Sequence, residues 1–529
     1  MRTFLLRTAL AIAVFSMAGT VSLASFAKAE TAKDLVIDFQ SSALIRQGIY
    51  CQDVNSVIAP FLTPKLMTFV EKQEKDVAKL LKFVLALGMR EVTFMHTSKD
   101  FLLSAELPKG KLEKLGAGEL SNESLAEAMG PDAAAVFIEE LSRSGTLPEV
   151  KKNVQPGVHE LDGIFMGVAG QTLLVGSSDL QVEVSRKKLL EGKRIAAMPE
   201  KKQQAWYKVD FQVNCASSES VEFSPKTYTQ ESIYFRTEDG WTQATTSNLA
   251  EFLTFAEQQA VVNLPDLPLY GEERPFLSMV YGGGLLEALT MVGVKGEFPP
   301  LHTLMAGTPF SAKDIKQFGC FIGGPKAHVF GFPVPGAIAL IDTTDELAAM
   351  VEELAVGAVP TVWREKTVGG WDRIRVADMV NVEGSPIPMP LVLGRKGGML
   401  MFGLMSHDQL DSPKDGSILQ AQVPAGEKIC GFMEFDFKGF WGHARALMGK
   451  ESPLRALAGA ARPEIAGNME AVDSLLETDP PVTRVSQWAR NDLSLAEAVF
   501  YENKEPTQFW DRFCDILFLA AESGTLEGL

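Results

Sequence analysis

Four residues in one short segment have side chains that could bind a soft metal ion. Residues 397–408 read GGMLMFGLMSHD and contain Met399, Met401, Met405 and His407. On a β-strand Met399 and Met401 would point to the same face, and thioether sulfur together with imidazole nitrogen suits copper(I). Methionine is also a common filler of protein cores, so burial without a metal is the alternative.

Carboxylates at two matching positions are the other candidates for chemistry. The segments AWYKVDFQ (205–212) and GFMEFDFK (431–438) align Asp210 with Asp436, and Glu434 lies two residues before Asp436, on the same strand face. Paired carboxylates can transfer protons or bind a cation. The simpler interpretation is that these charges lie on the polar face of a half-buried strand.

Motifs of known catalytic and phosphate-binding sites are missing from the sequence. The six histidines form no H-E-x-x-H pattern, and there is no G-x-S-x-G elbow. Ser185 and Lys188 form a bare S-x-x-K, without the S-D-N that accompanies it in serine acyl-transfer enzymes. The glycines of YGGGLLEALTM (281–291) lack the G-K-[ST] ending of a phosphate loop, so a tight turn is expected there. The sequence therefore predicts no catalytic residues and no cofactor.

Periodic apolar residues predict helices among more numerous strands. Residues 63–88 and 344–357 each begin with a threonine suited to cap a helix, repeat apolar residues every three or four positions, and end at a glycine. Ser178 and Ser406 each begin an S-x-x-Q sequence, the capping-box form that starts a helix. Alternating hairpins outnumber these helices, which favours the α+β class over a parallel α/β fold.

Ordered matches along the chain suggest a duplication. GIFMGVAGQTLLVG (163–176) and PLVLGRKGGMLMFG (390–403) share three glycines and a leucine at an offset of 227, and further matches follow in the same order. We therefore expect an α+β fold of two tandem homologous units, each of antiparallel β-hairpins packed with amphipathic helices. The expected bounds are 35–262 and 274–529, with a proline-rich linker at 263–273.

The first 29 residues have the order of a secretory signal peptide. Arg2 and Arg7 precede a short apolar run, and AKA (27–29) offers small residues for cleavage. An uncleaved membrane anchor is the alternative, but the apolar run is interrupted and short for a span. We therefore expect an exported protein without a transmembrane anchor after cleavage, periplasmic or, as the alternative, released outside the cell.

The acidic composition bears on partners. The formal charge of −17 moves to −20 when a signal peptide carrying Arg2, Arg7 and Lys28 is removed, which disfavours nucleic-acid binding. The cysteines are too widely spaced for a zinc knuckle or a C-x-x-C redox pair, and their pairing stays open because spacing alone does not determine it. They are Cys51, Cys215, Cys320, Cys430 and Cys514.

The signal sequence and the joints LLVGSSDL (173–180) and LMFGLMSHDQL (400–410) make the chain resemble exported bacterial tandem-repeat α+β proteins of unknown function. This resemblance implies no role for any individual residue. On these observations we expect an exported, non-catalytic binding or scaffold protein for an apolar ligand, such as a lipid, or for a cell-envelope protein. The alternatives are an exported hydrolase with scattered catalytic residues and a copper-handling protein.

Overall fold

The structure, a computed structural model, divides into two compact units. The first comprises Met1–Ser247 with Phe513–Leu529, and the second comprises Asn248–Arg512. The residues that it describes are 45–51, 64–65, 67–68, 88–97, 100–113, 121–131, 134–135, 138, 150–161, 163–192, 215–223, 226–236, 240–247, 261–271, 273–283, 314–329, 332–382, 384–449, 452, 455, 469–503, 511–513 and 515. The predicted signal peptide at 1–29 therefore lies outside them. The predicted segments 35–262, 263–273 and 274–529 stay a prediction, because compactness does not test homology.

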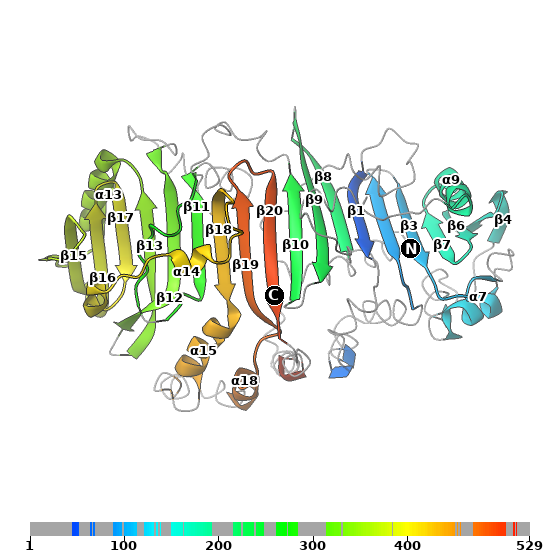
Figure 1. Ribbon diagram of the computed structural model, residues 1–529. Coiled ribbons are helices and arrows are strands. Elements are labelled where there is room, and N and C mark those ends of the chain that lie inside the picture. The colour runs from blue at the N-terminus through cyan, green and yellow to red at the C-terminus, as the bar shows by residue number, and fades with distance from the viewer. Residues whose placement is uncertain are drawn as a thin grey trace. The chain divides into compact units, whose positions relative to one another are not determined.

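The described strands of the first unit form an antiparallel sheet in the order β4-β5-β6-β7-β3-β2-β1-β8-β9-β10 (Figure 1). Helix α9 packs on β4–β7, and Arg186 of this helix donates from Nε to the carbonyl oxygen of Val168 at 2.9 Å. The strands are β1 Ile45–Cys51, β2 Val92–Thr97, β3 Phe101–Glu106, β4 Val150–Gln155, β5 Val158–Leu161, β6 Ile164–Ala169, β7 Thr172–Gly176, β8 Cys215–Phe223, β9 Lys226–Arg236 and β10 Gly240–Ser247; the helices are α7 Asn122–Met129 and α9 Asp179–Leu190.

The described strands of the second unit form another antiparallel sheet, in the order β14-β15-β16-β17-β13-β12-β11-β18-β19-β20 (Figure 1). These strands are β11 Leu277–Gly282, β12 Gln317–Val329, β13 Phe332–Asp342, β14 Arg364–Lys366, β15 Arg373–Val382, β16 Ser385–Lys396, β17 Met399–Leu404, β18 Ile429–Asp436, β19 Val482–Arg490 and β20 Leu495–Glu502. The helices are α13 Asp345–Ala358, η5 His407–Asp411, α14 Ser417–Gln420, α15 Phe437–Met448 and α18 Met469–Leu476.

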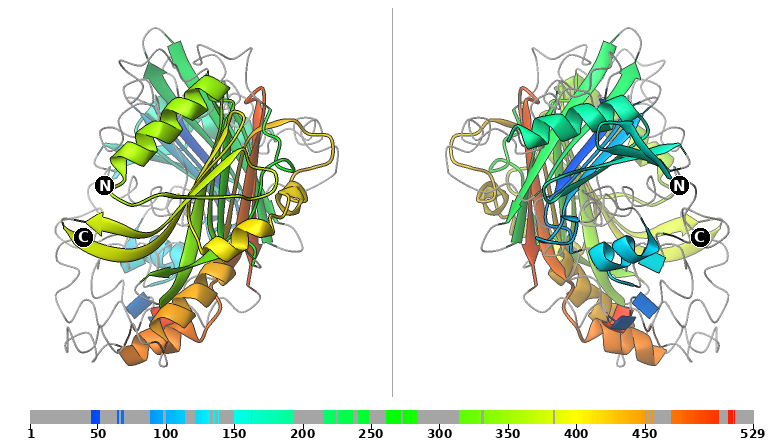
Figure 2. Two further views of the ribbon diagram at one scale, coloured as in Figure 1. Left: turned by 90° about the vertical axis from the view of Figure 1, so that its left-hand side faces the viewer. Right: turned by 90° about the vertical axis from the view of Figure 1, so that its right-hand side faces the viewer.

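Helices α13 and α14 lie on opposite faces of the second unit's sheet (Figure 2). On the face away from α13, strand alternation places Val280, Phe432 and Trp488 side by side, and all three are buried. Leu419 of α14 is also fully buried. The apolar core of this unit therefore extends across several strands on this face.

The expected α+β fold of two tandem homologous units is wrong. Strands hold far more of the described residues than helices do, so this part of the chain is mostly antiparallel β-sheet with few helices, and nothing in it shows two tandem units. The hairpins were expected to pair locally and pack on helices. Instead they pair edge to edge into one large antiparallel sheet in each unit, and strands such as β12 reach 13 residues. The long helices cover only parts of these sheets.

Among the described residues, no helix is both long enough and apolar enough to cross a membrane.

Candidate functional site

Helix α13 covers part of the second unit's sheet. Its sequence provides a capping residue at its start and apolar residues on the side that faces the sheet. Thr344 accepts a hydrogen bond from the backbone amide of Leu347 at 3.3 Å, and acidic residues occupy the first turn, where the helix dipole favours them. Its inward residues Leu347 and Ala348 are buried. The helix packs on β16 and β17.

An apolar cavity of about 290 Å³ lies between α13 and the sheet. Val351 and Ala355 line it from the helix, and every lining residue is apolar. The sheet contributes short side chains such as Ala339 as well as longer ones such as Leu393 and Leu400. Alanines on both the helix and the sheet are among the lining residues, and their side chains fill little volume.

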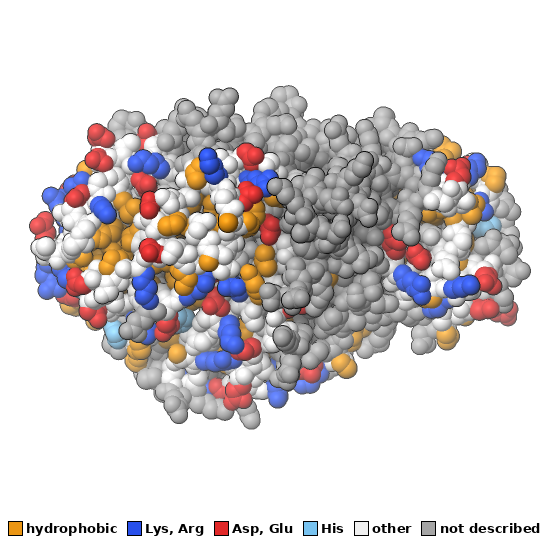
Figure 3. Space-filling view, viewed as in Figure 1, with side chains coloured by type: hydrophobic (Ala, Val, Ile, Leu, Met, Phe, Trp, Pro, Cys, Tyr) orange, Lys and Arg blue, Asp and Glu red, His pale blue; other side chains and the backbone are white. Residues whose placement is uncertain are grey.

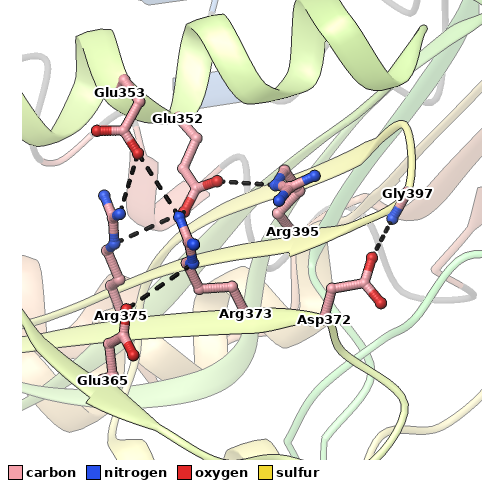
Figure 4. Close-up of polar contacts among 8 residues, drawn as sticks. All are labelled: Glu352, Glu353, Glu365, Asp372, Arg373, Arg375, Arg395 and Gly397. Carbon is pink, nitrogen blue, oxygen red and sulfur yellow. Dashed lines mark hydrogen bonds and ion pairs between the residues drawn. The ribbon is translucent and has the colours of Figure 1, made fainter.

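Beside this cavity, three arginines converge on one carboxylate of α13 (Figure 4). Glu352 is 2% exposed, and its Oε2 accepts a hydrogen bond from Nε of Arg395 at 2.8 Å. Nη1 of Arg373 and Nε of Arg375 lie 3.5 and 3.6 Å from the other carboxylate oxygen, Oε1. A buried carboxylate needs such partners, and through them this cluster connects α13 to β15 and β16.

Two exposed carboxylates border the same arginines. Oε1 of Glu353 accepts from Nη2 of Arg375 at 3.0 Å and lies 3.6 Å from Nη1 of Arg373, while Glu365 lies 3.8 Å from Nε of Arg373. The side chains of Glu353 and Glu365 are 62% and 73% exposed. In contrast, Nη1 of Arg375 is buried and has no hydrogen-bond partner among the described residues. The cluster therefore retains an unused donor.

Strand register makes the arginines and the cavity neighbours. Arg395 lies directly opposite Leu400 on β17, and Arg375 lies directly opposite Leu393 on β16. Directly opposite residues on one sheet face have Cβ atoms about 4.5–5.5 Å apart. Leu393 and Leu400 both line the cavity, so the strand positions of Arg375 and Arg395 lie next to its lining.

The predicted site residue Glu434 forms a separate buried ion pair. Nε and Nη2 of Arg274 each donate to one carboxylate oxygen of Glu434 at 2.7 Å, and Glu434 is fully buried. Burial raises the pKa of Glu434, against the opposing effect of Arg274. On the neighbouring strands, Ser278 and Ser486 flank Glu434, and their hydroxyls have no hydrogen-bond partner among the described residues. This closed arrangement is a structural ion pair in the core.

The other predicted carboxylates do not join Glu434 in a site. Asp436 is the N-cap of α15, where its Oδ1 accepts from the backbone amide of Gly439 at 2.9 Å. Asp210 lies outside the described residues. Asp436 and Glu434 are two residues apart on one strand, as predicted, but one caps a helix and the other is paired with Arg274.

The predicted metal-binding residues are distributed along β17 and beyond it. Met401 and Met405 are fully buried, and Met401 contributes to the lining of the cavity. Nδ1 of His407 lies 3.4 Å from Oδ1 of Asp378, beyond the end of the strand that begins with Met399. Met399 begins β17, whereas His407 begins η5, three residues after the last residue of that strand, Leu404. A copper site formed by these four residues stays a prediction.

The described residues contain no group of three or more histidine, cysteine or acidic side chains placed to hold a metal ion. Cys320 and Cys430 are free thiols, and burial raises the pKa of Cys430 to about 12, which makes it a poor nucleophile. The register of β1 with β8 places the backbone of Cys51 directly opposite that of Cys215. Cys514 lies outside the described residues.

Sequence reasoning missed the arginine cluster. Arg373 and Arg375 alternate on β15 and so share a sheet face, which the sequence DRIRV (372–376) could have indicated. Arg395 and Glu352 join them only through strand register and helix packing.

Comparison with protein-family models, with curated proteins and with solved structures finds no match to this chain.

The Arg274–Glu434 pair predicts a large effect on stability. Arg274→Met should lower the free energy of unfolding by about 3–5 kcal/mol, because it leaves a buried carboxylate without its partner. Adding Glu434→Gln to this variant should recover part of the loss. Urea denaturation at neutral pH measures both. Lys316→Met, which breaks an exposed pair with Asp342, is the control and should cost less than about 1 kcal/mol; equal losses for Arg274→Met and Lys316→Met would contradict the assignment.

Glu497 on β20 predicts a pH dependence of stability. Burial raises the pKa of Glu497 to about 7, Glu427 adds to this, and Arg490 acts in the opposite direction. Between pH 4.5 and about 7, Glu497 therefore holds a proton in the folded state that it has released in the unfolded state. The contribution of Glu497 to the free energy of unfolding falls as the pH rises through this range. Glu497→Gln should stabilise the protein by about 2–3 kcal/mol near pH 8 and by almost nothing near pH 4.5. Urea denaturation at both pH values is the measurement, and a gain that does not depend on pH would refute this prediction.

Proposed function

We propose that this chain is an exported, non-catalytic protein that binds an apolar small molecule in the cavity between α13 and the sheet. The observation that carries the proposal is the cavity of about 290 Å³ with a wholly apolar lining. Its volume lies just below the usual range of small-molecule sites, about 300–1,000 Å³, which suits a small ligand. An empty apolar cavity lowers stability, so a ligand that fills it gains the free energy of burying its own surface.

The cavity lining, the N-terminal sequence and the net charge support an exported, non-catalytic binding protein. No titratable group lines it, which favours binding over hydrolysis. The signal-like sequence at 1–29 supports export, with the periplasm as the proposed location. The described acidic and basic side chains on the second unit are interspersed on the face in Figure 3, and the chain carries a net charge of −17, so we do not propose a nucleic-acid partner.

The cavity beneath α13 suits a small molecule better than it suits a protein partner. A protein partner needs an accessible interface of about 800 Å² on each side, whereas this space is a cavity of about 290 Å³ between α13 and the sheet. We therefore choose the small apolar ligand over the envelope-protein partner.

Filling the cavity tests this proposal. Ala355 lines the cavity, whereas its neighbour Leu354 is 60% exposed on the same helix. Ala355→Trp should weaken binding of the neutral fluorophore N-phenyl-1-naphthylamine at least tenfold, because the indole occupies the space. Leu354→Trp is the matched control and should leave binding within about twofold. Fluorescence titration of the purified chain measures both, with circular dichroism to confirm folding.

No binding by the unsubstituted chain would refute the proposed function. Equal binding by the Ala355→Trp variant would show that the fluorophore binds elsewhere, and would also refute the assignment of this cavity.

A further inference from the structure

We infer that the ligand is a fatty acid, a single-chain carboxylate whose tail fills the cavity and whose head is bound by Arg373, Arg375 and Arg395. This inference rests on the proposed function and adds the chemistry of the ligand's head. It begins from position: the three arginines lie on the same sheet face as the cavity-lining residues Leu393 and Leu400. Arg375 lies directly opposite Leu393 and Arg395 directly opposite Leu400, while Arg373 lies directly opposite Arg395. A chain lying in the cavity would therefore end among the guanidinium groups.

The charges of the arginine cluster beside the cavity favour binding of an anionic head group. The side chains of Arg373, Arg375 and Arg395 are 39%, 14% and 23% exposed, and among the described residues Glu352 is the one buried carboxylate that they contact. Glu353 and Glu365 balance the formal charge, but both are largely exposed, and ion pairs at exposed positions contribute little. Three partly exposed positive charges thus face one buried negative charge.

The cluster also has hydrogen-bonding capacity for a second carboxylate. Nη1 of Arg375 is buried without a partner among the described residues, and a buried donor left unpaired costs free energy. Its other terminal nitrogen, Nη2, binds the exposed carboxylate of Glu353. A ligand carboxylate could take the place of Glu353, whose side chain can move into solvent, and could accept from both nitrogens of the fork.

The geometry favours a carboxylate over a bulkier head group. The planar fork of an arginine matches two carboxylate oxygens, and Glu353 already places one carboxylate at the position proposed for the ligand (Figure 4). The cavity volume of about 290 Å³ suits one alkyl chain and not two. We therefore commit to a single-chain fatty acid.

A matched pair of ligands separates the tail from the head. We would measure binding of decanoate and 1-decanol to the purified full chain near pH 8 by displacement of N-phenyl-1-naphthylamine. Decanoate should bind at least tenfold more tightly than 1-decanol, which is about the effect of one charge-assisted hydrogen bond. Decyl phosphate is the third ligand, and tighter binding of the phosphate than of decanoate by tenfold or more would overturn the choice of a carboxylate.

Two substitutions should act in opposite directions. Arg375→Gln should weaken decanoate binding about tenfold, whereas Glu353→Gln should strengthen it about threefold or more, because it removes the competing carboxylate. Neither should change the affinity for 1-decanol by more than about twofold. Arg373→Gln is a second arginine variant for the case that Arg375→Gln does not fold, since the ion-pair distances of Arg373 are all 3.5 Å or longer.

The outcomes distinguish the two proposals. If neither decanoate nor 1-decanol displaces the fluorophore, the proposed function fails. If both bind with equal affinity and the Arg375 and Glu353 variants change nothing, the cavity binds apolar ligands but the inferred head-group site is wrong. Opposite effects of the two substitutions on decanoate alone would support the inference.

Discussion

The carboxylate of Glu352 is the contact on which the arrangement of α13 depends. It is almost completely buried, so it must be compensated, and three arginines from β15 and β16 converge on it. Through these contacts the helix is attached to β15 and β16. The cavity lies between the same helix and the sheet, and its lining includes short side chains such as Ala339 and Ala355. The charges that attach the helix to the sheet therefore lie close to the space that the helix covers.

The second unit contains another buried carboxylate that is compensated in a different way. Glu434 is bound by one arginine through two short hydrogen bonds, which use both of its oxygens and leave a closed pair. Glu352 instead is shared by three arginines, one at 2.8 Å and two at 3.5 and 3.6 Å. Arg373 and Arg375 also contact exposed carboxylates, and Nη1 of Arg375 has no partner among the described residues. A closed pair suits a core, whereas an open cluster beside a cavity can exchange partners. This contrast is why the site is assigned to Glu352 and not to the carboxylate that the sequence indicated.

Local signals in the sequence predicted local structure well at some positions. Thr344 caps α13 and Ser178 caps α9 as expected, because a capping side chain and its backbone partner lie within one turn. At Ser406 the same S-x-x-Q pattern begins only a short 3₁₀ helix without a side-chain cap. The fold class was mispredicted because hairpins of similar sequence can pair locally or edge to edge, and only the complete strand order decides between them.

The candidate site could not be predicted in the same way. Alternation on β15 places Arg373 and Arg375 on one face, but their meeting with Arg395 depends on register and their meeting with Glu352 depends on how the helix packs. The methionines of β17 stood out because of their chemistry, yet Met401 and Met405 are buried as ordinary core residues are. Residue type revealed which side chains could act, while the sheet determined which of them are neighbours.

The net charge of the chain shapes how such a site could select its ligand. With a formal charge of −17, the protein as a whole repels an anion, so long-range attraction cannot concentrate a fatty acid at the cavity. Screening at physiological salt limits this repulsion to about 8 Å, whereas pairing with partly buried guanidinium groups is screened much less. Recognition of a carboxylate would thus rest on short-range hydrogen bonds and apolar burial. Added salt should therefore reduce the repulsion on approach more than it weakens the bound state, which is the opposite of the behaviour of a protein that attracts anions through a basic surface.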